Sequence, residues 1–157
     1  MSIMVNQHSN QARVSAVCIP DAPVFRSAGP VTSMLAAKEL RSRDVIKIAG
    51  WNIRTLRDEG TQSITAKPLH QYGVCVACLS EVCLPDSSHR LIKVPEVDSV
   101  YHLYHSGVTD NIALHRVVIA LNPEAQAALL AWDPISHRLA RIRLKGSVVN
   151  VSVISVY

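Results

Sequence analysis

The chain has 157 residues, of which 48% are hydrophobic and only 4% aromatic, and its formal net charge at pH 7 is +4. This hydrophobic content excludes an intrinsically disordered chain and predicts one domain with a mostly aliphatic core, while the positive charge fits a phosphate-rich partner as well as an ordinary solvated surface. No apolar run is long enough for a membrane-spanning helix and no secretory signal begins the chain, so we expect an intracellular protein, in the nucleus or the cytoplasm, without a membrane partner.

Residues 1–43 differ from the rest of the chain. They hold Ser, Asn, Gln and Pro in scattered order and show no sustained periodicity. A segment without a periodic apolar face has little surface to bury. We therefore expect a flexible leader over residues 1–43 and a folded domain over residues 44–157.

The sequence of the first half of the expected domain predicts two buried strands with a helix between them. Residues 45–51 and residues 74–80 are short and apolar, which is typical of strands buried in a core. Residues 60–72 form a weaker helix candidate, because Pro68 would cost about 3 kcal/mol in a helix interior.

Two further strands and a short helix follow. Residues 100–106 and residues 112–121 predict the third and fourth strands. Asn122 is suited to cap the N-terminus of a helix and Pro123 to occupy its first turn, which predicts a short helix over residues 123–131.

The last part of the chain again favours strands. Over residues 139–144 the apolar side chains alternate with Arg141 and Arg143, which predicts a strand with a basic outer face. Residues 148–157 predict a final strand. The whole pattern indicates a mixed α/β (α+β) fold.

Two polar segments come directly after buried strands. WNIRTL covers residues 51–56, and LSE covers residues 79–81. Polar residues at the carboxyl ends of core strands are where α/β folds usually place their sites. Asn52 and Glu81 are therefore the candidate site residues, and the alternative is a turn amide and a solvated loop carboxylate.

Taken as a set, these segments resemble the endonuclease/exonuclease/phosphatase superfamily, in particular the endonuclease domain of LINE-type non-LTR retrotransposons and craniofacial-development-protein-like sequences. The resemblance covers residues 45–157. It is supported by residues 101–107, residues 117–121, residues 129–143 and the closing VVNVSVISVY, which in this family continues into Ala-Pro-Thr.

The resemblance implies a four-layer sandwich of two β-sheets with outer helices, of which this chain would be the N-terminal half, incomplete at the C-terminus. It also implies cleavage of phosphodiester or phosphomonoester bonds with one or two divalent metal ions, usually magnesium. Carried over by position, Glu81 matches the metal-binding carboxylate, and Asn52 matches the catalytic amide that orients the site and the phosphate. Magnesium prefers carboxylate oxygen and keeps several of its waters.

The remaining residues of the family's site have no counterpart here. Its Asp-x-Asn pair and its Asp-His pair lie in the C-terminal half, and no residue follows Tyr157 to supply them. We therefore expect a truncated magnesium-dependent phosphodiesterase, a DNA endonuclease domain of retroelement type, that is inactive alone. A non-catalytic nucleic-acid-binding module and a folded relic without a selected activity are the alternatives.

Three arginines are candidate nucleic-acid contacts, on DNA rather than RNA. Arg54 lies in the WNIRTL segment, and Arg141 and Arg143 lie on the predicted basic strand face. Contacts between such side chains and phosphates give salt-dependent, sequence-independent binding. The alternative is the ordinary solvated face of a strand.

The cysteines offer a rival site. Cys75, Cys78, Cys83 and His89 could be taken for a zinc or redox group. Cys75 and Cys78, however, lie in an apolar strand, where cysteine behaves as a small hydrophobic residue. We interpret them as core residues and keep zinc as the alternative.

Overall fold

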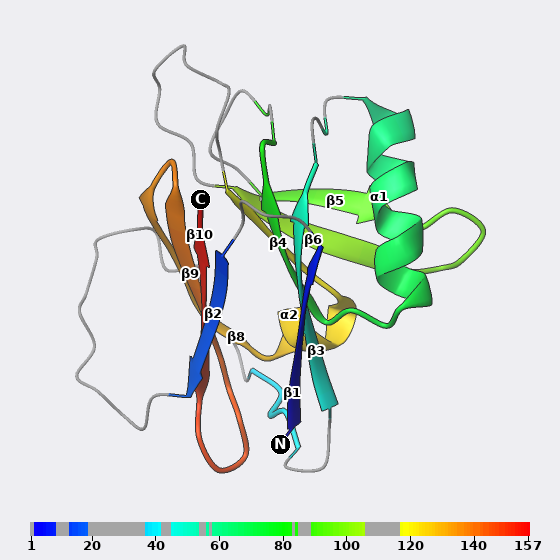
Figure 1. Cartoon of the computed structure of the whole chain (residues 1–157). Coiled ribbons are helices and arrows are strands. Elements are labelled where there is room, and N and C mark those ends of the chain that lie inside the picture. The colour runs from blue at the N-terminus through cyan, green and yellow to red at the C-terminus, as the bar shows by residue number, and fades with distance from the viewer. Residues whose placement is uncertain are drawn as a thin grey trace.

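The computed structural model describes the backbone of residues 2–8 and 13–18, and both backbone and side chains of residues 37–41, 45–53, 56, 58–82, 84, 89–105 and 117–157. These residues form two β-sheets and two helices (Figure 1). The chain is thus mixed α/β, as its sequence predicts. In the described part of the chain, no helix is long and apolar enough to span a membrane.

The larger sheet has six strands. Its neighbours run in the order β1 (Ser2–His8), β3 (Val45–Asn52), β4 (Val76–Ser80), β7 (Val118–Leu121), β6 (Val100–His105) and β5 (His89–Lys93). The first three strands are parallel to one another, and the remaining pairings are antiparallel. The carboxyl ends of β3 and β4 therefore meet at one edge of this sheet.

The smaller sheet is antiparallel throughout. It consists, in spatial order, of β2 (Arg13–Cys18), β10 (Val151–Val156), β9 (Leu139–Leu144) and β8 (Leu129–Ser136). Figure 1 shows it standing face to face with the larger sheet, so that β10 lies across from β3 and β4.

The two faces of the larger sheet bury different cores. Ile119 and Leu121 of β7 belong to a core shared with β9 and β10 of the smaller sheet, for example with Ile142. Val118 and Ala120, which alternate with them, pack in a second core with the helix α1 (Glu59–Gln71). Both faces of β7 are thus buried, which explains its continuous apolar sequence, and the molecule has the layer order sheet, sheet, helix.

A side chain caps the N-terminus of each helix, as the sequence predicts for Asn122. The Asp58 carboxylate accepts a 2.8 Å hydrogen bond from the Thr61 backbone N–H at the start of α1. At the start of the short helix α2 (Pro123–Ala127), the Asn122 side chain accepts a 2.8 Å bond from the Ala125 N–H. Each bond satisfies one of the N–H groups left open at a helix start. Helix α1 continues through Pro68 despite the cost of proline at that position.

The structure contains four strands that the sequence interpretation missed. Strands β1 and β2 lie in the segment expected to be a flexible leader, where they pair with β3 and β10. Strand β5 buries only Ile92 among its five residues and so lacks a clear apolar face. Strand β8 contains Pro134 and two register shifts. Because β8 begins at Leu129, α2 ends at Ala127 and is shorter than expected.

Candidate functional site

The carboxyl ends of β3 and β4 bring the two predicted site residues together. Asn52 and Ser80 are register partners in this parallel pair, and Glu81 follows directly. The Asn52 Nδ2 donates a 2.9 Å hydrogen bond to Glu81 Oε1. The juxtaposition follows from the strand order, because neighbouring parallel strands end at the same edge of a sheet.

A third side chain reaches the same carboxylate from the opposite sheet. The Tyr157 hydroxyl donates a 2.8 Å hydrogen bond to Glu81 Oε1, the atom that also accepts from Asn52. Tyr157 follows β10, and its backbone N–H donates to the Arg138 carbonyl at 3.0 Å. Glu81 is thus held between the two sheets. Sequence reasoning missed Tyr157, because the contact depends on how the sheets dock and no short-range pattern records that.

The backbone of Glu81 is in the left-handed region, with φ of 61°. A non-glycine residue there carries a cost of the order of 1–3 kcal/mol. The Ile53 N–H donates to the Ser80 carbonyl at 3.0 Å, which ties the two strand ends together beside this residue. Glu96, in the connection between β5 and β6, has a similar φ of 66°, so the conformation by itself does not mark a site.

The pKa of the Tyr157 phenol is raised, first because it donates a hydrogen bond to the Glu81 carboxylate and second because of desolvation. Ionisation would lose this bond and place a phenolate beside a carboxylate. The phenol therefore remains a hydrogen-bond donor at neutral pH.

Two oxygen atoms of residues next to Glu81 have no hydrogen-bond partner among the described residues. The Asn52 Oδ1 and the Ser80 Oγ are both buried without a bond in the described part of the structure. As register partners they point to the same face, the one that carries Cys78 into the core between the sheets. A buried polar atom left unsatisfied costs about 1–3 kcal/mol, and such atoms in native proteins point to an unseen water, ion or ligand.

These atoms are compatible with a magnesium ion. The Glu81 carboxylate, the Asn52 Oδ1 and the Ser80 Oγ are all oxygen donors, which this cation prefers, and magnesium is commonly held by one or two carboxylates with water. Within the described ranges no group of three or more His, Cys, Asp or Glu side chains could hold a metal ion. Among the described residues, Glu81 would be the one carboxylate of such a site.

Two of the three candidate basic residues lie on the smaller sheet. Arg141 and Arg143 alternate with Ile142 and so face away from the core between the sheets. Arg141 is engaged with Asp133, through Nη2 at 2.7 Å and Nε at 2.9 Å. The Asp133 carboxylate thus compensates the positive charge of Arg141. Arg54 lies outside the described residues.

Cys78 and Cys75 belong to the core between the sheets or pack against it. Cys78 is buried between the sheets, and burial raises the pKa of its thiol to about 12. Cys75 is half-buried against the same core. A thiol with this pKa is not ionised at neutral pH and is a poor metal ligand. Cys83 lies outside the described residues, and His89 is on β5.

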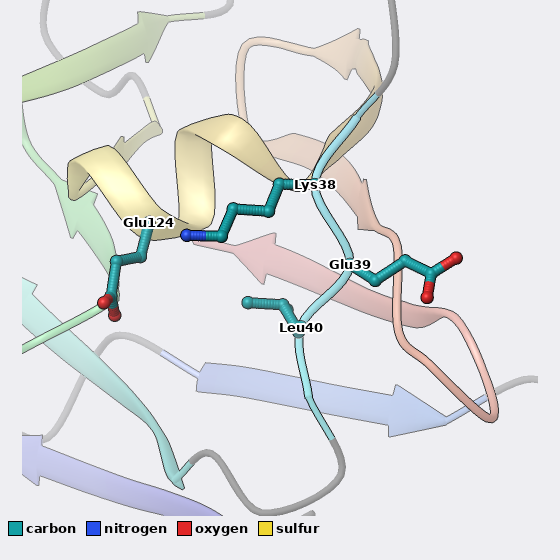
Figure 2. Close-up of a pocket in the computed structure, with 4 residues that line it drawn as sticks. All are labelled: Lys38, Glu39, Leu40 and Glu124. Carbon is teal, nitrogen blue, oxygen red and sulfur yellow. The ribbon is translucent and has the colours of Figure 1, made fainter.

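A small pocket of about 30 Å³ lies at some remove from Glu81, beside α2. At roughly 10–15 Å³ each, it has room for a few water molecules at most. Figure 2 shows Lys38 extending toward α2 and Glu39 pointing away from the pocket. Glu39 forms a 3.1 Å ion pair with Lys145. The pocket gathers no set of reactive groups.

Comparison of the chain with protein-family models, with curated proteins and with solved structures found no match. The functional interpretation therefore depends on the group formed by Asn52, Ser80, Glu81 and Tyr157, which we call the Glu81 site.

Proposed function

We propose that this chain is the N-terminal half of a magnesium-dependent phosphodiesterase domain, a DNA endonuclease of the endonuclease/exonuclease/phosphatase superfamily and of the LINE retrotransposon type. One observation supports the proposal. The Asn52 amide and the Tyr157 phenol both bond to the Glu81 carboxylate at the carboxyl ends of β3 and β4. The four-layer sandwich is part of the same proposal, and the face-to-face sheets with α1 outside are consistent with three of its layers.

The proposal gives each side chain a task. Glu81 supplies the charge that holds magnesium, and the Asn52 Oδ1 adds a neutral oxygen that is buried without a hydrogen-bond partner among the described residues. Asn52 Nδ2 and the Tyr157 hydroxyl both bond to Glu81 Oε1 and fix the orientation of the carboxylate. A bound magnesium ion would neutralise charge on a phosphate oxygen of the nucleic acid.

We further propose that the chain binds phosphodiesters without cleaving them. Hydrolysis also needs a group that activates water. The resemblance assigns no residue of this sequence to that role, so the Glu81 site supplies only the metal-binding half of the chemistry.

The second candidate is a nucleic-acid-binding module that does not use a metal ion. It is favoured by the outward placement of Arg141 and Arg143 on one strand, and weakened by the ion pair between Arg141 and Asp133. The affinity of such a module for DNA would depend strongly on salt, and binding would not require magnesium.

The test is the affinity for a short DNA duplex, measured with magnesium and with a chelator. The variants are Glu81→Gln and, as a matched control, Glu96→Gln, because both glutamates have positive φ and only Glu81 is in the site. We expect magnesium to raise the affinity of the wild type and the control by roughly tenfold, about 1.4 kcal/mol, and to have no such effect on Glu81→Gln.

The same samples are assayed for nicking of a supercoiled plasmid, where none is expected. Binding that magnesium leaves unchanged or weakens to the same extent in all three proteins would reject the metal site and favour the basic-face module. Magnesium-dependent nicking by the wild type that Glu81→Gln lacks would keep the site and overturn the proposed inactivity.

A further inference from the structure

Two histidines face each other across the edge pair of the larger sheet. In the antiparallel register of β5 and β6, His89 pairs with Tyr104 and Leu91 pairs with His102. His89 and His102 are therefore diagonal neighbours on one face of the sheet. Nε2 of His89 lies 3.0 Å from Nδ1 of His102, at hydrogen-bond distance, and the tautomers decide which nitrogen donates.

This separation is close to the one that a shared metal ion requires. Two imidazole nitrogens bound to one tetrahedral ion at about 2.0–2.1 Å lie about 3.3 Å apart. The rings are inclined by 24°, with their centroids 5.2 Å apart. One ion bound to both nitrogens would replace the hydrogen bond between them, and the ring that donates it would carry its proton on the other nitrogen instead.

The surroundings restrict the movement of these rings. Tyr104 lies 4.9 Å from the His89 ring, centroid to centroid, and 5.5 Å from the Trp132 ring on the opposite sheet. Its hydroxyl donates a 3.0 Å hydrogen bond to Gln126 Oε1 of α2. His89 thus packs against an aromatic side chain that a hydrogen bond holds in place. This packing lowers the conformational entropy that the His89 ring loses on binding a ligand.

We propose that His89 and His102 form a binding site for a divalent transition-metal ion of the zinc or copper class. Neutral imidazole suits these ions, whereas magnesium prefers oxygen. Among the described residues, no third His, Cys, Asp or Glu joins the pair. This site is separate from the Glu81 site and does not depend on the proposed function.

The protonation of His102 agrees with this assignment. Burial, and then the neighbouring His89, lower the pKa of His102 below its usual value. His102 is therefore neutral at neutral pH, and only a neutral imidazole can bind a metal ion.

The test is a calorimetric titration with Zn²⁺ at neutral pH on the wild-type chain, His89→Gln, His102→Gln and the control His70→Gln. His70 is exposed in the last turn of α1. Any binding at the cysteines is common to all four proteins, so a difference between them reports the histidines. We expect either site variant to bind roughly tenfold or more weakly, and the control to match the wild type.

A second measurement uses the wild type alone and so tests the proposal even if a variant does not fold. In NMR spectra of the wild type, Zn²⁺ should shift the ring resonances of His89 and His102 and leave those of His70 in place, and added magnesium should not reverse the shifts. Equal Zn²⁺ affinity in the wild type and both site variants, or unshifted ring resonances of the pair, would overturn the proposal.

Discussion

The amide of Asn52 donates a 2.9 Å hydrogen bond to the carboxylate of Glu81, although the two residues are 29 positions apart in the chain. The bond joins the ends of two parallel strands. It leaves the Asn52 Oδ1 buried and without a partner in the described part of the structure, so the same side chain both orients the carboxylate and offers an oxygen beside it.

Replacing Asn52 by Asp should make the stability of the protein depend on magnesium. The change removes the hydrogen bond and sets two carboxylates side by side, which repel each other unless a cation lies between them. Without a divalent ion we expect a loss of about 1–3 kcal/mol in the free energy of unfolding. Magnesium should then raise the melting temperature of Asn52→Asp more than that of Asn52→Ala, measured by thermal unfolding. Equal responses would count against a cation at this position.

The ionisation of Tyr157 should report the state of Glu81. The pKa of this phenol is raised by its hydrogen bond to the carboxylate, so Glu81→Ala should return it toward the usual value of 10.0. The measurement is an NMR titration of the tyrosine ring resonances. The control is Tyr104, whose pKa is raised by burial and not by Glu81 and should not change. If Tyr157 titrates identically in the wild type and in Glu81→Ala, its bond to Glu81 is absent in solution.

The elements that could be predicted are those with a clear local sequence pattern, such as apolar alternation or a helix cap. The alternation of Ile142 with Arg141 and Arg143 was enough to predict which side of β9 faces the core, and the structure confirms it. The cap at Asn122 likewise confirms where α2 begins. Strand β5 was missed because a five-residue strand that buries only Ile92 has no clear period.

The site was predictable only within one sheet. Asn52 and Glu81 could be paired from the sequence because each follows a buried strand, and parallel neighbours end together. Tyr157 could not be added to them, because its contact with Glu81 spans 76 residues and forms only when the smaller sheet docks on the larger one. The cluster of His89, His102 and Tyr104 could not be predicted either, because it depends on the register in which β5 pairs with β6.

The packing between the sheets should dominate stability. Ile142 is fully buried in the shared core, whereas Ile135 of the same sheet is 57% exposed. Ile142→Ala should lower the free energy of unfolding by about 2–5 kcal/mol, because it removes buried methylene groups and leaves a cavity. Ile135→Ala should change it by under about 1 kcal/mol. Chemical denaturation measures both, and similar losses would contradict the face-to-face arrangement of the sheets.

The Tyr101 hydroxyl should couple stability to high pH. It is 2% exposed, it donates a 2.8 Å hydrogen bond to the Val74 carbonyl, and burial raises its pKa from 10.0 to about 12. Because the pKa is raised in the folded state, the stabilisation is complete below pH 10 and is lost as the pH rises from 10 to about 12.

The variant Tyr101→Phe should lack this part of the alkaline loss. At neutral pH it should be less stable by about 1–3 kcal/mol, because the Val74 carbonyl loses its partner in the core. The exposed Tyr72 provides the control Tyr72→Phe, which should behave as the wild type. Denaturation curves recorded at neutral and alkaline pH give both quantities, and an unchanged alkaline loss in Tyr101→Phe would assign it to another group.

An NMR titration of the chain with Mg²⁺ in the absence of nucleic acid shows whether Glu81 and Asn52 hold a magnesium ion. We expect the largest shifts at the Asn52 side-chain amide and at the backbone amides around Glu81. We also expect Glu81→Gln to abolish these shifts and Glu96→Gln to retain them. Shifts that lie elsewhere, or that persist unchanged in Glu81→Gln, would contradict magnesium binding by Glu81 and Asn52.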